Sequence, residues 1–120
     1  MDGIRGSIII GKFMLAFRRI DFTGKSVSTE WGNIYRSAIN AQNINIAPSA
    51  GPDFSSKPYV TVSLDITSGT CWLGMYGNGG VHKVGSNLRW GFSNNELQLL
   101  RATSGNVSGS VIILALGEIA

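Results

Sequence analysis

The chain has 120 residues, a length that fits a single domain able to bury a core without disulfides. It is 43% hydrophobic and only 14% charged, and its ten Lys and Arg residues are scattered, so the net charge of +3 does not form the clustered basic footprint of a nucleic-acid-binding protein. No apolar run approaches the ~20 residues of a membrane-spanning helix, and we expect no membrane insertion.

Strand patterns begin close to the N-terminus. Residues 7–20 are predicted as one long or bent strand, in which Gly11 marks a bulge. Residues 1–6 are expected to be a disordered remnant of a tag or stalk, and residues 7–120 to form one β-sandwich domain. Three short strands follow, at residues 26–31, 33–39 and 43–47.

The middle of the chain contains a loop followed by the clearest strand. Residues 48–53 include two prolines and a glycine, which interrupt a hydrogen-bonded ladder, so a loop is predicted there. In residues 57–66, Val60, Val62 and Leu64 alternate with polar residues, which is the period of two expected for a half-buried strand.

Further strands are separated by glycine-rich turns. Asn78-Gly79-Gly80 is typical of a hairpin turn, and a second turn is predicted at residues 104–106. The total is seven to nine short strands and no helix, which predicts an all-β fold, namely a jelly-roll-like antiparallel β-sandwich. These later strands are expected at residues 71–76, 81–84, 96–102 and 107–116, and residues 89–92 are left open.

The last strand is apolar on both faces. Val111 and Ile113 lie on one side, and Leu114 and Leu116 on the other. A strand that turns both faces away from water needs a layer on each side. In a chain this short, one layer is the domain's own second sheet, and we expect the other to be another copy of the chain. The predicted interface residues are Ile8, Ile10, Val111, Ile113, Leu114 and Leu116.

Residues that carry chemistry are few. One histidine and one cysteine are too few for a zinc site, and no aspartate-rich loop suggests calcium, so neither a metal nor another cofactor is expected. Cys71 is predicted to be a small buried hydrophobe. A glycan-cleaving enzyme would depend on an acid such as Asp53, Asp65 or Glu96, but no local pair of carboxylates supports one. We expect a binding or structural protein rather than an enzyme.

Aromatic residues are the remaining candidates for binding. Sugars lay their C–H faces on aromatic rings, while polar side chains bind the hydroxyl groups. Trp31 and Trp72 are expected in the core, whereas Trp90 is left open between the core and a ligand site. The predicted sugar contacts are Tyr76, His82, Asn87, Arg89 and Trp90.

Three stretches, in order, resemble a known family. Residues 31–37, Trp-Gly-Asn-Ile-Tyr-Arg-Ser, are similar to a signature in C-terminal domains of minor structural and tail-fibre proteins from phages and prophages of Gram-positive bacteria. Residues 47–64 resemble that family's segment of spaced prolines and alternating valines, and residues 102–117 resemble its closing segment. The likeness covers most of residues 20–117, while residues 1–19 match least.

The resemblance implies a homotrimeric β-sandwich at the tip of a tail fibre or baseplate that binds carbohydrate on the host cell. Its implied partners are further copies of the chain, host cell-wall polysaccharide and other tail or baseplate proteins. Its implied location is the virion, after synthesis in the bacterial cytoplasm. The family's ligand contacts share no motif, so no binding residue is carried over. The alternative is a purely structural trimerisation or virion component without a ligand.

Overall fold

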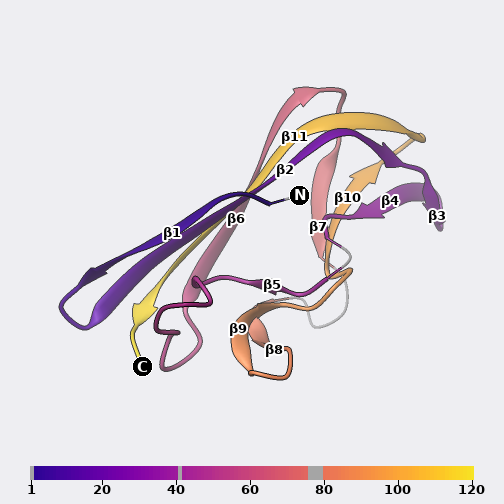
Figure 1. Cartoon of the computed structure of the whole chain (residues 1–120). Helices are drawn as coiled ribbons and strands as arrows, with labels where there is room; N and C mark the ends of the chain where they lie inside the picture. The colour runs from indigo at the N-terminus through magenta and orange to yellow at the C-terminus, as the bar shows by residue number, and fades with distance from the viewer. Residues whose placement is uncertain (1, 41, 76–79) are drawn as a thin grey trace.

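The computed structural model describes residues 2–40, 42–75 and 80–120, with the backbone alone for residues 2–4. Over these residues the protein has eleven strands, which pair antiparallel, and no helix (Figure 1). The predicted all-β antiparallel fold is confirmed, whereas the predicted seven to nine strands are too few. None of the described segments is a helix that could cross a membrane.

The strands form three sheets, which we call sheets A, B and C. Sheet A has the order β1-β2-β11-β6 and contains β1 (Asp2–Ile10), β2 (Phe13–Val27), β11 (Gly105–Glu118) and β6 (Tyr59–Ser68). Sheet B has the order β3-β4-β10-β7 and contains β3 (Thr29–Trp31), β4 (Ile34–Ala38), β10 (Leu97–Arg101) and β7 (Trp72–Met75). Sheet C has the order β5-β9-β8 and contains β5 (Ile44–Asn45), β9 (Arg89–Phe92) and β8 (His82–Val84).

The N-terminal segment differs from the prediction. Gly11 has a φ of +59°, a conformation that glycine adopts without steric cost, and the chain reverses there. Because of this turn, β1 and β2 form a hairpin and not one long strand. β1 begins at Asp2, so residues 2–6, expected to be disordered, belong to a strand. Arg5 of this strand donates a hydrogen bond of 2.7 Å to the backbone oxygen of Ala47, which ties the strand to the segment after β5.

One of the two central strands of sheet A is β11. It pairs with β2 on one side and with β6 on the other along most of its length. The register shifts near Gly109, where φ is +157° and a Cβ would lie 2.2 Å from the backbone oxygen of Asp65. Only glycine fits at this bulge, so Gly109 permits the register shift in the pairing of β11 with β2 and β6.

The core lies between sheet A and the two smaller sheets. Met14 and Ala16 of β2, with Val111 and Ile113 of β11, are fully buried in one cluster with residues from sheets B and C. Each large apolar side chain that leaves water in this way contributes about 1.5–3 kcal/mol. This side of sheet A is its inner face, and the opposite side is its outer face. The main partners from the other sheets are Ile44, Phe92, Leu97 and Leu99.

The loop predicted at residues 48–53 is confirmed as irregular chain. Directly after it, Phe54 is fully buried and forms an isolated bridge with Ile119. The amide of Ser55 donates a hydrogen bond of 2.9 Å to the backbone oxygen of Glu118. The loop therefore closes the core at the end of the molecule where β11 finishes.

Candidate functional site

The outer face of sheet A is rich in apolar side chains. Along β11, Ile113 points into the core, so its neighbour Leu114 and then Leu116 point outward. Along β2 the same alternation turns Phe13 and Leu15 outward. Both central strands of the sheet thus expose large apolar side chains on the same side.

Strand register aligns these side chains in rows across the sheet. Leu15 lies between Ile8 of β1 and Leu116 of β11, and Leu116 in turn lies beside Tyr59 of β6. All four strands therefore contribute to one apolar row. Directly opposed residues on one sheet face have Cβ atoms about 4.5–5.5 Å apart, which is within contact range for such side chains. We call the whole set the apolar face: Ile8, Ile10, Phe13, Leu15, Tyr59, Leu114 and Leu116.

The apolar face is large for a single chain. The exposed fraction of its side chains ranges from 42% for Leu15 to 86% for Tyr59. Taking roughly 150–250 Å² for a large side chain, these residues leave on the order of 800 Å² exposed. The largest apolar patch of a typical monomer is about 300–600 Å². A shallow hollow of about 320 Å³, lined in part by Leu15, Tyr59 and Leu114, lies within the face.

Polar groups border the apolar face at both ends. Further along sheet A, Arg19 Nε lies 2.9 Å from Asp21 Oδ1, and Ser110 Oγ donates to the same oxygen at 2.7 Å. The hydrogen bond from Ser110, with a smaller effect of Arg19, lowers the pKa of Asp21 below its ordinary value. At the other end, Lys57 and Glu118 line a second hollow of about 200 Å³. An apolar centre with a polar rim is the usual anatomy of a protein–protein interface.

The structure separates the predicted interface residues into two groups. Val111 and Ile113 are fully buried in the core of their own chain, so their assignment to the interface is wrong. The sequence shows that both sides of β11 are apolar, but it does not show which side meets the second layer. The other predicted residues lie exposed on the apolar face: Ile8, Ile10, Leu114 and Leu116.

Three members of the apolar face were missed in the sequence. Phe13 and Leu15 alternate with Met14 and Ala16, and this two-sided apolar pattern could have indicated a second covered face. Tyr59 carries no local signal. It lies on the face because β6 pairs with β11, which is distant in the sequence.

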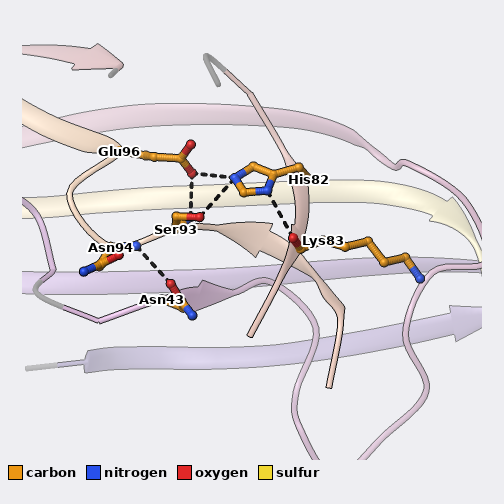
Figure 2. A network of polar contacts seen from close by, with 6 residues as sticks. All are labelled: Asn43, His82, Lys83, Ser93, Asn94 and Glu96. Atoms are coloured by element: carbon orange, nitrogen blue, oxygen red, sulfur yellow. Dashed lines mark hydrogen bonds and ion pairs between the residues drawn. The ribbon is translucent and has the colours of Figure 1, made fainter. Parts of the chain in front are cut away.

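His82, one of the predicted sugar contacts, lies in a polar network between β8 and the segment before β10 (Figure 2). Its Nε2 is 2.8 Å from Glu96 Oε1 and 3.3 Å from Ser93 Oγ. Glu96 also accepts a hydrogen bond from the backbone amide of Ser93 at 2.5 Å. The side chain of Glu96 is only 6% exposed, and that of His82 is 27% exposed. The imidazole thus binds groups of its own chain.

Hydrogen-bond geometry limits what this network can do. The Nδ1 atom of His82 is 3.1 Å from the backbone oxygen of Lys83, which can only accept, so Nδ1 carries the proton of that bond. Nε2 donates to an ionised Glu96 only when the ring carries a second proton. In a nucleophile–base–acid arrangement the serine and the carboxylate contact opposite ring nitrogens. Here Ser93 and Glu96 share Nε2, as Figure 2 shows, so the three side chains are not arranged as a catalytic triad.

Arg89 and Trp90 hold the loop that precedes Phe54. The Arg89 guanidinium donates to the backbone oxygen of Pro48 at 2.9 Å. The Trp90 amide donates to Asp53 Oδ2 at 3.0 Å, and its indole Nε1 donates to the backbone oxygen of Phe54 at 3.2 Å. The indole ring packs against the core on one side. These contacts give both side chains a structural task, while sugar contact by them stays a prediction.

The β8–β9 hairpin separates two of the predicted sugar contacts, Asn87 and His82. Asn87 is exposed in the turn between β8 and β9, at the opposite end of this hairpin from His82. Lys83 Nζ lies 5.2 Å from the centre of the Trp90 ring and interacts with its π face. Tyr76 lies outside the described residues.

The tryptophans expected in the core are at the surface. Trp31 is 36% exposed and Trp72 is 46% exposed, and neither packs against the core cluster. Their placement in the core is therefore wrong. Both lie on edge strands of sheet B, β3 and β7. A tryptophan in a strand is buried only if its side of the sheet is covered, and the sequence near it does not show which side that is.

Cys71 and the acidic residues add no further site. Cys71 is half-buried against the core, and burial raises the pKa of its thiol, as expected for a structural cysteine. Among the described residues, no group of three or more His, Cys, Asp and Glu side chains is placed to hold a metal ion.

Comparison of the chain with family models, with curated proteins and with solved structures gave no match in any of the three.

Proposed function

We propose that the chain is a self-associating β-sandwich module whose copies pack through the apolar face into a homotrimer. The layered core between sheet A and sheets B and C supports the sandwich, and a jelly-roll-like order is part of the proposal. The module acts at the tip of a phage tail fibre or baseplate, in the virion, and binds host cell-surface carbohydrate. The resemblance of residues 31–37, 47–64 and 102–117 to tail proteins supports this setting.

The apolar face is the observation that carries the proposal. Apolar surface in contact with water is unfavourable by roughly 25 cal/mol per Å². A standard protein–protein interface buries about 800 Å² on each partner, which matches the extent of the face. Packing of a second copy would remove this surface from water, and the charged groups at both ends of the face would form the rim.

In this proposal the copies form a closed ring and not a two-fold dimer. In a cyclic trimer, each chain contributes two different patches that meet on its neighbours. Ile8 and Ile10 lie on β1 at one edge of sheet A, and Tyr59 lies on β6 at the other edge. The two edges thus offer the two different apolar patches that such a ring requires.

Assembly would serve binding through avidity. Three weak sites on one rigid axis raise the effective affinity for a surface with repeated ligands without any new contact. Such a role needs no catalytic group, only an accessible site on each copy.

A purely structural role is the second candidate, and one observation favours it. Arg89 and Trp90, two predicted sugar contacts, make hydrogen bonds to the loop between β5 and β6. If these bonds are their whole task, the β8–β9 hairpin supplies no ligand site. The protein would then be a trimerisation or virion component alone.

The test compares two substitutions of the same kind. Leu116→Asp places a carboxylate at the centre of the apolar face, whereas Leu88→Asp changes an equally large, 61% exposed leucine in the β8–β9 turn. Leu88 has a φ of +53°, which aspartate tolerates well. Sedimentation equilibrium should show a single chain for Leu116→Asp and an unchanged assembly for Leu88→Asp. Equal masses for both variants would contradict the proposal.

A further inference from the structure

We infer that the outer face of sheet B is an oligosaccharide-binding surface centred on Trp72. The inference deepens the carbohydrate part of the proposed function and rests on it. It moves the site away from the β8–β9 hairpin, where the sequence predicted it.

Strand register places two tryptophans and an arginine on the same side of sheet B. Leu99 of β10 is fully buried in the core, so Leu100 faces the outer side. Leu100 is directly opposite Trp72 of β7 on one side and Arg36 of β4 on the other. Arg36 pairs with Thr29, two residues before Trp31 on β3, so Trp31 shares this face.

The outer face of sheet B has an aromatic ring near each edge. We call the area formed by Trp31, Arg36, Leu100 and Trp72 the platform. Leu100 is almost fully buried and fills the space above Gly74, where a Cβ would lie 2.5 Å from its Cδ1. The absence of a side chain at Gly74 therefore leaves room for the side chain of Leu100. The guanidinium of Arg36 lies 5.8 Å from the centre of the Trp31 ring and interacts with its π face.

The dimensions of the platform suit an extended ligand. The strands that carry Trp31 and Trp72 are separated by β4 and β10, so three inter-strand spacings, roughly 14 Å, lie between them. This distance is longer than one sugar ring. Two indole rings at this separation can each stack on a different ring of one oligosaccharide.

A hollow with both apolar and polar lining residues adjoins Trp72. It has a volume of about 190 Å³ and is lined by Thr70, Trp72, Arg101 and Thr103, together with Cys71 and Ala102. Arg101 donates to the backbone oxygen of Thr103 at 3.0 Å and to that of Thr70, which holds the backbone of both threonines beside the hollow. An aromatic ring next to polar side chains is the combination that recognises a sugar, since it serves both the C–H face and the hydroxyl groups.

This chemistry favours a saccharide over a second copy of the chain as the occupant. The apolar face of sheet A exposes seven large apolar side chains, whereas the platform exposes two tryptophans with polar groups around them. The platform is too small in apolar area for a stable interface between proteins. It also lies on the opposite side of the core from the apolar face, so assembly would leave it open.

Glycan binding tests the inference directly. The trimer and its variants are applied to an array of neutral hexose, N-acetylhexosamine and uronic-acid oligosaccharides, and the strongest binder is titrated by tryptophan fluorescence. Trp72→Ala should lower the affinity by about tenfold or more, because a central aromatic contact dominates such sites. Trp31→Ala should lower it less. Asn87→Ala, at an exposed position of the earlier predicted site, should leave the affinity unchanged.

Controls separate this inference from the proposed assembly. The monomeric Leu116→Asp variant should keep the affinity of a single site in solution and lose only avidity for a dense glycan surface. An affinity that is unchanged in Trp72→Ala but lowered in Asn87→Ala would overturn the site but keep a carbohydrate-binding function. A trimer that binds no oligosaccharide of the array would overturn the site and keep the assembly. A change of mass in Trp72→Ala would identify the platform as an interface between copies and overturn the inference.

Discussion

The outer faces of sheets A and B belong to the same core but differ in chemistry. Sheet A turns a row of leucine, isoleucine, phenylalanine and tyrosine side chains outward across all four strands. Sheet B turns out two separated tryptophans near an arginine and two threonines. In both sheets, alternate residues of the central strands fill the core. The residues between them point outward, and their chemistry can differ from one sheet to the other. One suits contact with another copy, and the other suits a ligand.

The largest effect is expected inside β11, where neighbouring residues face the core and the apolar face. Ile113→Ala creates a cavity in the core and should lower the free energy of unfolding by about 2–5 kcal/mol. Leu114→Ala, one residue on, should change the free energy of unfolding of the single chain by less than about 1 kcal/mol but weaken self-association. Chemical denaturation at low protein concentration measures the first quantity, and sedimentation the second. Similar losses of stability in both variants would contradict the assignment of the two faces.

A second comparison sets Trp90 against Trp72. Trp90→Ala removes a ring packed on the core and its hydrogen bond to Phe54, so the free energy of unfolding should fall by about 2–4 kcal/mol. Trp72→Ala should lower it by less than about 1 kcal/mol, because that ring is half-exposed outside the core. Thermal and urea unfolding of both variants provide the measurement. A larger loss of stability in Trp72→Ala than in Trp90→Ala would mean that Trp72 stabilises the fold and Trp90 does not.

The His82 network gives a smaller expected effect, which tests whether it is structural. Glu96→Gln removes a buried carboxylate that contacts His82 and the amide of Ser93, and should lower the free energy of unfolding by about 1–3 kcal/mol. Glu30→Gln, at an exposed position of β3, is the matched control and should have almost no effect. Glycan affinity should be the same in both variants. A large loss of affinity in Glu96→Gln alone would place the ligand at His82.

The smallest effect is a pH dependence at the rim of the apolar face. The pKa of Asp21 is lowered in the folded state by Ser110 and Arg19. The native protein therefore stabilises the ionised carboxylate relative to the protonated carboxyl group. This contribution to stability is present above the ordinary pKa of 3.8 and is lost as the pH falls through the lower folded value. Asp21→Asn should therefore lower the unfolding midpoint slightly at pH 7 and leave it nearly unchanged at the acid end. A difference that grows on acidification would contradict the assigned direction.

Local periodicity predicted much of this fold. The alternation of Val60, Val62 and Leu64 identified β6, and the apolar C-terminal segment identified β11 as a strand with apolar side chains on both sides. Such signals are visible because strand side chains repeat every two residues. The hairpin at Gly11 was missed, since a glycine between apolar stretches is compatible with a bulge as well as with a turn.

The candidate sites were harder to predict because they depend on pairing between distant segments. Which side of β11 is inward depends on how sheets B and C cover it, so Val111 and Leu114 could not be told apart locally. Trp72 joins Arg36 on one face only through β10. The internal hydrogen bond of Trp90 is made to Phe54, far away in the chain.

The most direct test of the account is the mass of the unmodified chain by light scattering across a wide concentration range. The account predicts three times the 12.8 kDa of one chain, with dissociation only on strong dilution. A mass of one chain at every concentration would contradict it, since the side chains of Phe13, Leu116 and Tyr59 would then face water without any partner to cover them.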